Sequence, residues 1–152
     1  MDVIILIGLQ ASGKTSFAIR HFADLYDYVS KDRFRNAKKR QRRQERLIER
    51  ALQSGRSVVV DNTNATVEAR APVIELGRRY GARIIGFYFE SSVPACLERN
   101  RARRGKERVP DVAIFTTVSR LEPPSCGEDF DRLYHVSIDG DGNFRVQDWK
   151  EE

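Results

Sequence analysis

The feature that most constrains the fold is the start of the chain, where an unbroken apolar run passes directly into a glycine-rich loop. Residues 2–7 (DVIILI) are almost all apolar, which is typical of a strand buried on both faces of a parallel sheet. The next segment, GLQASGKT, has the spacing G-x-x-x-x-G-K-[ST] of a phosphate-binding loop. Its glycines allow a tight turn whose N–H groups converge on phosphate oxygens, at the positive end of the following helix. The pattern predicts nucleoside triphosphate binding, without separating a kinase from an ATPase or a switch protein.

Within this loop, we expect Lys14 to reach the β- and γ-phosphates of ATP and the Thr15 hydroxyl to ligate Mg²⁺. A second acid, Asp61, ends the apolar run 57–60. A carboxylate at a strand end beside a phosphate loop often organises the metal, and we expect it to act through a bound water. The alternative is that Asp61 caps the following turn. The residues expected to surround the phosphates are Gly8, Ala11, Ser12, Gly13, Lys14, Thr15 and Ser16.

Further apolar runs alternate with segments of helical character, which predicts an α/β fold with a mostly parallel five-stranded sheet flanked by helices. In such a sheet, ligands bind at the carboxyl ends of the strands. With no repeat or linker, the chain is expected to form a single domain over residues 1–152. The other expected strands are 57–61, 83–89, 133–138 and a short one near 28–30, and the helices lie within 32–53, 66–80, 93–102 and 111–121.

Charge and composition restrict the partners. The net charge is +5, and residues 31–50 hold ten Lys or Arg against three acids, with a second basic cluster at 99–108. Such patches suit phosphate-rich ligands, although solvated helix faces give the same pattern. No stretch approaches the roughly 20 apolar residues of a membrane span. Two cysteines without a CxxC spacing favour a reducing cytoplasm over a disulfide framework or zinc site.

Several segments together resemble the polynucleotide 5′-kinase branch of the P-loop phosphotransferases, the nucleic-acid end-healing kinases. They are GLQASGKTS, SKDRFR, VVVDNTNATVEAR, CLERNRARRGKERVP, which resembles the arginine-rich lid of that family, and LEPPSCGEDFDRLYHV. The resemblance covers nearly the whole chain. It implies a P-loop kinase fold with an arginine-rich lid, ATP and Mg²⁺ as cofactors, and transfer of the γ-phosphate to the 5′-hydroxyl end of RNA or DNA.

The resemblance also implies residue roles. Asp32 falls on the general base that accepts the proton of the 5′-hydroxyl, and Arg35 on the arginine that grips the adjacent phosphate. Positions three apart on a helix are neighbours, which suits this pairing. Arg99, Arg104 and Arg108 are the lid candidates for the ATP phosphates, and Arg104 joins Lys14 and Asp32 in the expected catalytic set. The lid is one residue longer between RN and RG than the family pattern, which leaves its register open.

A basic helix over 35–50 is expected to guide the incoming strand, with Arg35, Lys38, Lys39, Asn62, Thr63, Asn64 and Arg70 contacting nucleic acid. The family leaves room for ligase or phosphatase modules in the same repair system. Two rival functions stay open: a small-molecule kinase of the same fold, acting on a sugar, antibiotic or nucleoside, and a non-catalytic nucleotide-binding RNA adaptor.

The motif IDGDGN at 138–143 resembles the opening of an aspartyl-phosphatase, but only nine residues follow it. We therefore expect a hairpin turn between YHVSI and FRVQDW.

Overall fold

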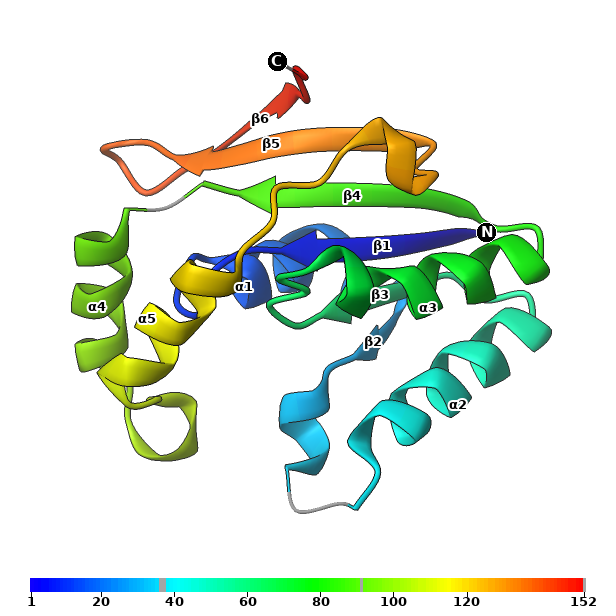
Figure 1. Cartoon of the computed structure of the whole chain (residues 1–152), viewed down its shortest axis with the longest axis horizontal. Coiled ribbons are helices and arrows are strands. Elements are labelled where there is room, and N and C mark those ends of the chain that lie inside the picture. The colour runs from blue at the N-terminus through cyan, green and yellow to red at the C-terminus, as the bar shows by residue number, and fades with distance from the viewer. Residues whose placement is uncertain (36–37, 91, 152) are drawn as a thin grey trace.

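The computed structural model describes residues 1–35, 38–90 and 92–151. Across these residues, six strands form one sheet in the order β2-β3-β1-β4-β5-β6 (Figure 1). Neighbours from β2 to β5 pair in parallel, and β6 pairs antiparallel with β5. The strands are β1 (Asp2–Ile7), β2 (Asp27–Val29), β3 (Val58–Asp61), β4 (Arg83–Phe89), β5 (Arg132–Ile138) and β6 (Phe144–Asp148).

The prediction of five strands is corrected to six in the described part of the chain. The expected hairpin is present, with the Asp139 N–H donating to the Asn143 carbonyl at 2.9 Å. Its second arm is β6. Four of the five residues of β6 are exposed, so the sequence gives no apolar pattern that separates an edge strand from a tail.

Helices cover both faces of the sheet. On one face, α2 (Arg40–Gln53) and α3 (Val67–Arg79) share a core with the side chains of Val3, Ile5 and Ile7. On the other, α1 (Lys14–Phe22) packs on Ile4 and Leu6. The alternating side chains of β1 thus serve two cores, which explains why the strand is apolar throughout.

Two further helices, α4 (Val93–Ala102) and α5 (Asp111–Arg120), lie together beyond the carboxyl ends of the strands (Figure 1). They share a small core around Cys96 and Ile114. The loop that joins them, residues 103–110, is called the lid loop, and it contains the 3₁₀ turn η2 (Gly105–Glu107). Within the described residues, no helix is long and apolar enough to cross a membrane.

The expected helix within 32–53 begins differently. A 3₁₀ turn, η1 (Lys31–Phe34), comes first, and α2 starts only at Arg40, because Lys39 has the left-handed φ of 58°. Residues 36–37, inside the predicted basic helix, lie outside the described residues. Ser30 caps η1, its Oγ accepting from the Asp32 N–H at 3.3 Å.

Candidate active site

The phosphate-binding loop joins β1 to α1 at the carboxyl edge of the sheet. Its two glycines have positive φ, 154° at Gly8 and 98° at Gly13. A Cβ on Gly8 would lie 3.0 Å from the Phe89 Cβ, and one on Gly13 would lie 3.0 Å from the Phe144 Cε1. The loop is therefore wedged between β4 and the β5–β6 hairpin, and both positions require glycine.

Lys14 lies under this loop, with 7% of its surface exposed. Its Nζ donates to the Leu9 carbonyl at 2.6 Å, the Gly8 carbonyl at 3.0 Å and the Ser12 hydroxyl at 3.4 Å. These partners are all neutral. Burial lowers the pKa of Lys14 to about 8, and the Asp61 charge opposes the shift. A buried cation held by neutral oxygens fits an anionic phosphate as its missing charged partner.

Thr15, Asp61 and Tyr28 form a compact group beside Lys14. The Thr15 hydroxyl donates to the Asp61 Oδ2 at 2.7 Å, and the Tyr28 hydroxyl donates to the same oxygen at 2.5 Å. Burial raises the pKa of Tyr28, and the Asp61 charge adds to the shift, so the phenol stays a donor. A hydroxyl and a buried carboxylate are oxygen ligands of the kind that Mg²⁺ accepts.

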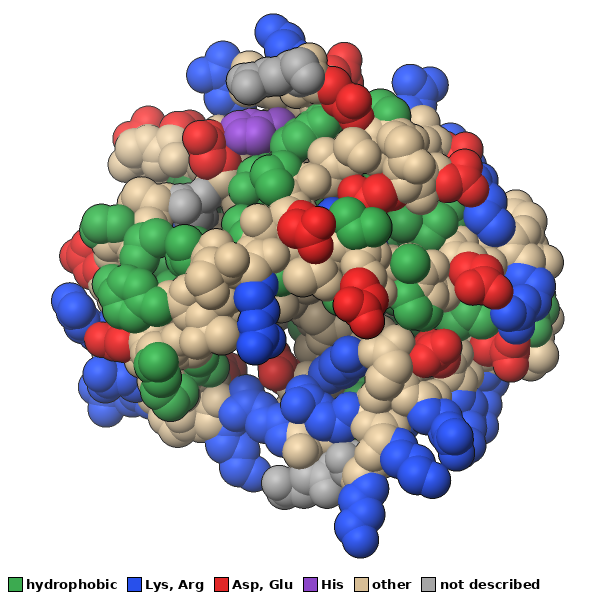
Figure 2. All heavy atoms as spheres, in the orientation of Figure 1, with side chains coloured by type: hydrophobic (Ala, Val, Ile, Leu, Met, Phe, Trp, Pro, Cys, Tyr) green, Lys and Arg blue, Asp and Glu red, His purple; other side chains and the backbone are tan. Residues whose placement is uncertain are grey.

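A cavity of about 480 Å³ opens in front of the loop. It brings Lys14, Thr15 and Asp61 together with Asp32 and Arg35, as the sequence predicted for one site. Lys and Arg side chains gather around the hollow at the lower centre of Figure 2. Six cations line the cavity against three acids: Lys14, Lys31, Arg35, Arg40, Arg103 and Arg120 against Asp32, Asp61 and Glu107. The site is built for an anionic ligand.

On the acceptor side, Asp32 and Arg35 lie close together. The Arg35 Nε is 4.0 Å from the Asp32 Oδ1, and the Asp32 side chain is 72% exposed. The Arg35 guanidinium also donates to the Lys106 carbonyl in the lid loop. Asp32 is thus free to meet a substrate, while Arg35 connects η1 to the lid.

The DNTN segment braces this arrangement. The Asn62 Oδ1 accepts from the Lys31 N–H at 2.9 Å, and its Nδ2 donates to the Gln44 Oε1 at 2.6 Å. Asn64 is buried and donates to the Leu6 carbonyl at 2.7 Å. Asn62, Thr63 and Asn64 line the cavity, but both amides are occupied by protein groups. These bonds hold η1 and β1 in place, and the expected contact of the segment with nucleic acid stays a prediction.

The structure distinguishes the lid arginines, whose register the sequence leaves open. Arg99 donates to the Ala11 carbonyl at 3.2 Å, next to the phosphate-binding loop as expected. Arg103, rather than Arg104 or Arg108, lines the cavity, and the latter two are exposed outside it. Asn100 is fully buried and holds the lid loop by bonds to both the N–H and the carbonyl of Val109.

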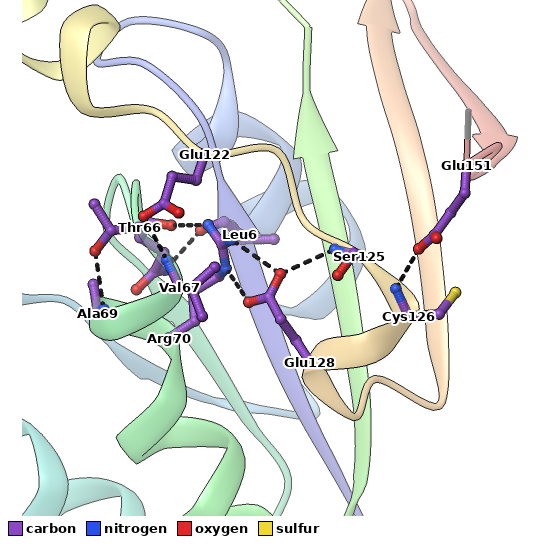
Figure 3. Close-up of polar contacts among 11 residues, drawn as sticks. Leu6, Thr66, Val67, Ala69, Arg70, Glu122, Ser125, Cys126, Glu128 and Glu151 are labelled. Carbon is purple, nitrogen blue, oxygen red and sulfur yellow. Dashed lines mark hydrogen bonds and ion pairs between the residues drawn. The ribbon is translucent and has the colours of Figure 1, made fainter.

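The expectation that Arg70 contacts nucleic acid is corrected. Its side chain is fully buried and pairs with Glu128 through two bonds of 2.8 and 3.0 Å, while Nη1 donates to the Asn64 carbonyl (Figure 3). Glu128 in turn accepts from the Ser125 N–H at 2.9 Å. Arg70 therefore ties α3 to the segment before β5. Lys38 and Lys39 are exposed and lie outside the cavity lining.

Several residues of the site carried no signal in the sequence. Gln10 donates to the Thr117 hydroxyl at 2.9 Å across the cavity wall, and Tyr28 reaches Asp61 from the neighbouring strand. Lys31 and Arg40 are hidden within the basic run, where spacing does not distinguish a lining residue from a solvated one. The remaining unpredicted residues of the lining include Thr66, Glu107, Thr116 and Arg120.

A strand, phosphate-binding loop and helix, with a carboxylate on the adjacent strand and a basic lid, define a P-loop nucleotide-binding domain of the kinase type. Residues 3–124 match the model of the AAA domain family, and the chain belongs to that family.

One curated relative is the bifunctional polynucleotide phosphatase/kinase of Schizosaccharomyces pombe. It is 27% identical over 139 residues, which are 89% of this chain and 33% of the relative. The chain thus spans about a third of that protein's length.

Solved structures of similar fold differ in their substrates. Chaetomium thermophilum Kti12 with ADP-AlF3 has a TM-score of 0.70 and 18% identity, covering 90% of this chain and 89% of that one. A fungal RNA kinase scores 0.68 at 18% identity, covering 93% and 40%. A gluconokinase from Sinorhizobium meliloti scores 0.61 at 22% identity, covering 90% and 82%. These likenesses establish the α/β P-loop kinase fold.

Proposed function

We propose that the protein transfers the γ-phosphate of ATP to the 5′-hydroxyl end of RNA or DNA. The observation that carries this proposal is the exposed Asp32 carboxylate, which lines the same cavity as Lys14 and has Arg35 beside it. Asp32 can therefore orient a hydroxyl in the same cavity in which Lys14 holds a phosphate of the nucleotide. Arg35, next to Asp32, can hold a phosphate of the acceptor.

On the nucleotide side, the N–H groups of the loop and Lys14 hold the triphosphate, with the lid arginines Arg99 and Arg103 closing over it. Thr15 and Asp61 are the residues that would hold Mg²⁺, Asp61 through a bound water. The metal, when bound, neutralises charge on the β- and γ-phosphate oxygens. The similarly folded Kti12 structure contains ADP-AlF3, which supports a nucleotide in this site.

On the acceptor side, the 5′-oxygen attacks the γ-phosphorus as the bond to the β–γ bridging oxygen breaks, and Asp32 accepts the hydroxyl proton. A carboxylate is a weak base, but phosphoryl transfer has a loose transition state, so that positioning matters more than basicity. Arg35 contributes by holding the phosphate next to the attacking hydroxyl. The excess of cations around the cavity favours a polyanionic acceptor over a neutral one.

The runner-up is a small-molecule kinase, for which the likeness to a gluconokinase is the specific observation. It predicts no dependence of the rate on oligonucleotide length. The non-catalytic adaptor predicts oligonucleotide binding without turnover.

The decisive experiment offers γ-labelled ATP and Mg²⁺ with a single-stranded 5′-hydroxyl oligonucleotide to the wild type, to Asp32→Asn and to the control Asp24→Asn, an exposed acid outside the cavity lining. We expect label at the 5′ end with the wild type and the control, and its loss in Asp32→Asn. ATP binding without transfer to any RNA or DNA end would overturn the proposal, and gluconate and nucleosides in the same assay would test the runner-up.

We also propose that residues 1–152 act as one kinase domain in the cytoplasm, and that a phosphatase or ligase serves the same ends. The relative that combines a phosphatase with a kinase supports the second point.

A further inference from the structure

Arg40, the first residue of α2, has a feature that the roles above do not explain. It is partly buried and lines the cavity, and its Nε is buried without a hydrogen-bond partner among the described residues. A buried guanidinium nitrogen left unbonded costs free energy, because it has lost water and gained nothing in return. Such an atom at a cavity wall indicates that a ligand supplies the missing acceptor.

Lys31 lies on the same wall. It is partly buried and lines the cavity, and its backbone N–H is fixed by Asn62. The pKa of Lys31 is lowered by burial and, next, by the charge of Arg40, with Glu45 opposing the shift. Two cations are thus held within electrostatic reach of each other in a partly dry site. An anion between them would relieve both the repulsion and the unbonded nitrogen.

Nearby acids do not fill this role. The Glu45 carboxylate accepts from the Gln41 side chain at 3.1 Å. The Asp32 carboxylate lies beside Arg35. Among the described residues, both carboxylates thus have other partners, which leaves a bound ligand as the source of the anion for Lys31 and Arg40.

The phosphate sites proposed above account for three of the other four lining cations. Lys14 and Arg103 face the triphosphate, and Arg35 stands beside Asp32 for the phosphate next to the reacting hydroxyl. We propose that Arg40, with Lys31, binds the second phosphate of the acceptor strand, counted from the 5′-hydroxyl. This inference rests on the proposed function and specifies its substrate: an acceptor with two phosphates on its 3′ side is used far better than one with a single phosphate.

The test is an acceptor series with a 5′-hydroxyl: a nucleoside 3′-monophosphate, a dinucleotide with a 3′-phosphate and a trinucleotide with a 3′-phosphate. These carry one, two and three phosphates. Values of kcat/KM are measured for the wild type, Arg40→Gln and Arg42→Gln. Arg42 is the matched control because it removes the same charge from the same helix, is exposed and lies outside this cavity. Binding of a 5′-hydroxyl trinucleotide, measured by fluorescence anisotropy at several salt concentrations, gives a readout independent of turnover.

We expect the wild type to gain about tenfold or more in kcat/KM from the first to the second phosphate, as for a charge-assisted hydrogen bond. Arg40→Gln should lose this gain, with a smaller loss on the mononucleotide than on the longer acceptors, and should lower the salt dependence of binding by about one phosphate contact. Arg42→Gln should retain the gain. Equal losses on all three acceptors, or the same loss in Arg42→Gln, would overturn the inference. Failure of the proposed function looks different, since the wild type would then phosphorylate none of the three acceptors.

Discussion

The Tyr28 hydroxyl lies 2.5 Å from the Asp61 Oδ2, the same oxygen that the Thr15 hydroxyl contacts at 2.7 Å. Two neutral donors thus hold one oxygen of the carboxylate, which fixes its orientation and leaves Oδ1 for a further partner. The Arg33 guanidinium lies 4.2 Å from the centre of the Tyr28 ring and helps to position it. Tyr28 therefore supports the residues that would hold the metal, although no motif includes it.

Tyr28→Phe should raise the Mg²⁺ concentration needed for half-maximal activity by about tenfold or more, because groups that orient a metal ligand commonly contribute that much. Mn²⁺ binding in the presence of a non-hydrolysable ATP analogue, followed by electron paramagnetic resonance, should weaken in parallel. Tyr26→Phe is the matched control, since it removes a similar bond of 2.9 Å to Asp2, outside the cavity lining. If both variants bind Mn²⁺ as the wild type does, Tyr28 is only a packing residue.

Lys14→Met should make the nucleotide-free protein more stable while it weakens ATP binding. Burial lowers the pKa of Lys14 from 10.5 to about 8, so at neutral pH the folded protein carries a buried positive charge that destabilises it. Removing it should raise the free energy of unfolding at pH 7 by about 1–3 kcal/mol. Urea denaturation measures this gain.

The pH dependence of the same variant provides a second check. Between pH 8 and 10.5 the unfolded chain keeps a proton that the folded chain has released, so wild-type stability rises with pH relative to Lys14→Met. The advantage of the variant should therefore shrink through this window. Lys150→Met, at an exposed lysine, should show no such change. A constant difference from pH 7 to 10.5 would contradict the argument.

Glu128→Ala should destabilise the protein by about 3–5 kcal/mol, because it leaves the fully buried Arg70 without its charged partner. Glu75→Ala breaks the exposed pair with Arg79 and should change stability by less than about 1 kcal/mol. Chemical denaturation measures both. At a temperature where Glu128→Ala is folded, its oligonucleotide affinity should equal that of the wild type. A weaker oligonucleotide affinity of the folded Glu128→Ala variant would indicate that Arg70 contributes to nucleic-acid binding.

Local patterns predicted the parts of this protein that depend on neighbouring residues. The apolar run of β1 and the spacing from Gly8 to Thr15 fixed the loop and its helix, and four helices appeared close to their expected positions. Tyr28 and Asp61 meet only because β2 and β3 are adjacent in the sheet, and strand order is not written in either segment. Arg70 was assigned to nucleic-acid contact because its partner, Glu128, is distant in sequence and joins it only in the folded chain.

The lid gives the last prediction. Its register depends on Asn100, whose two bonds to Val109 close the loop and set Arg103 against the cavity. Arg103 also donates to the Glu107 carbonyl at 3.3 Å, an exposed bond that a phosphate can replace. Arg103→Gln should therefore lower kcat/KM for ATP by about a hundredfold or more, as expected for loss of a guanidinium at the transferred phosphoryl group. Arg104→Gln, one residue on and exposed, is the matched control and should have a much smaller effect. The reverse order of effects would mean that Arg104, the candidate named from the sequence, acts on the transferred phosphoryl group in place of Arg103.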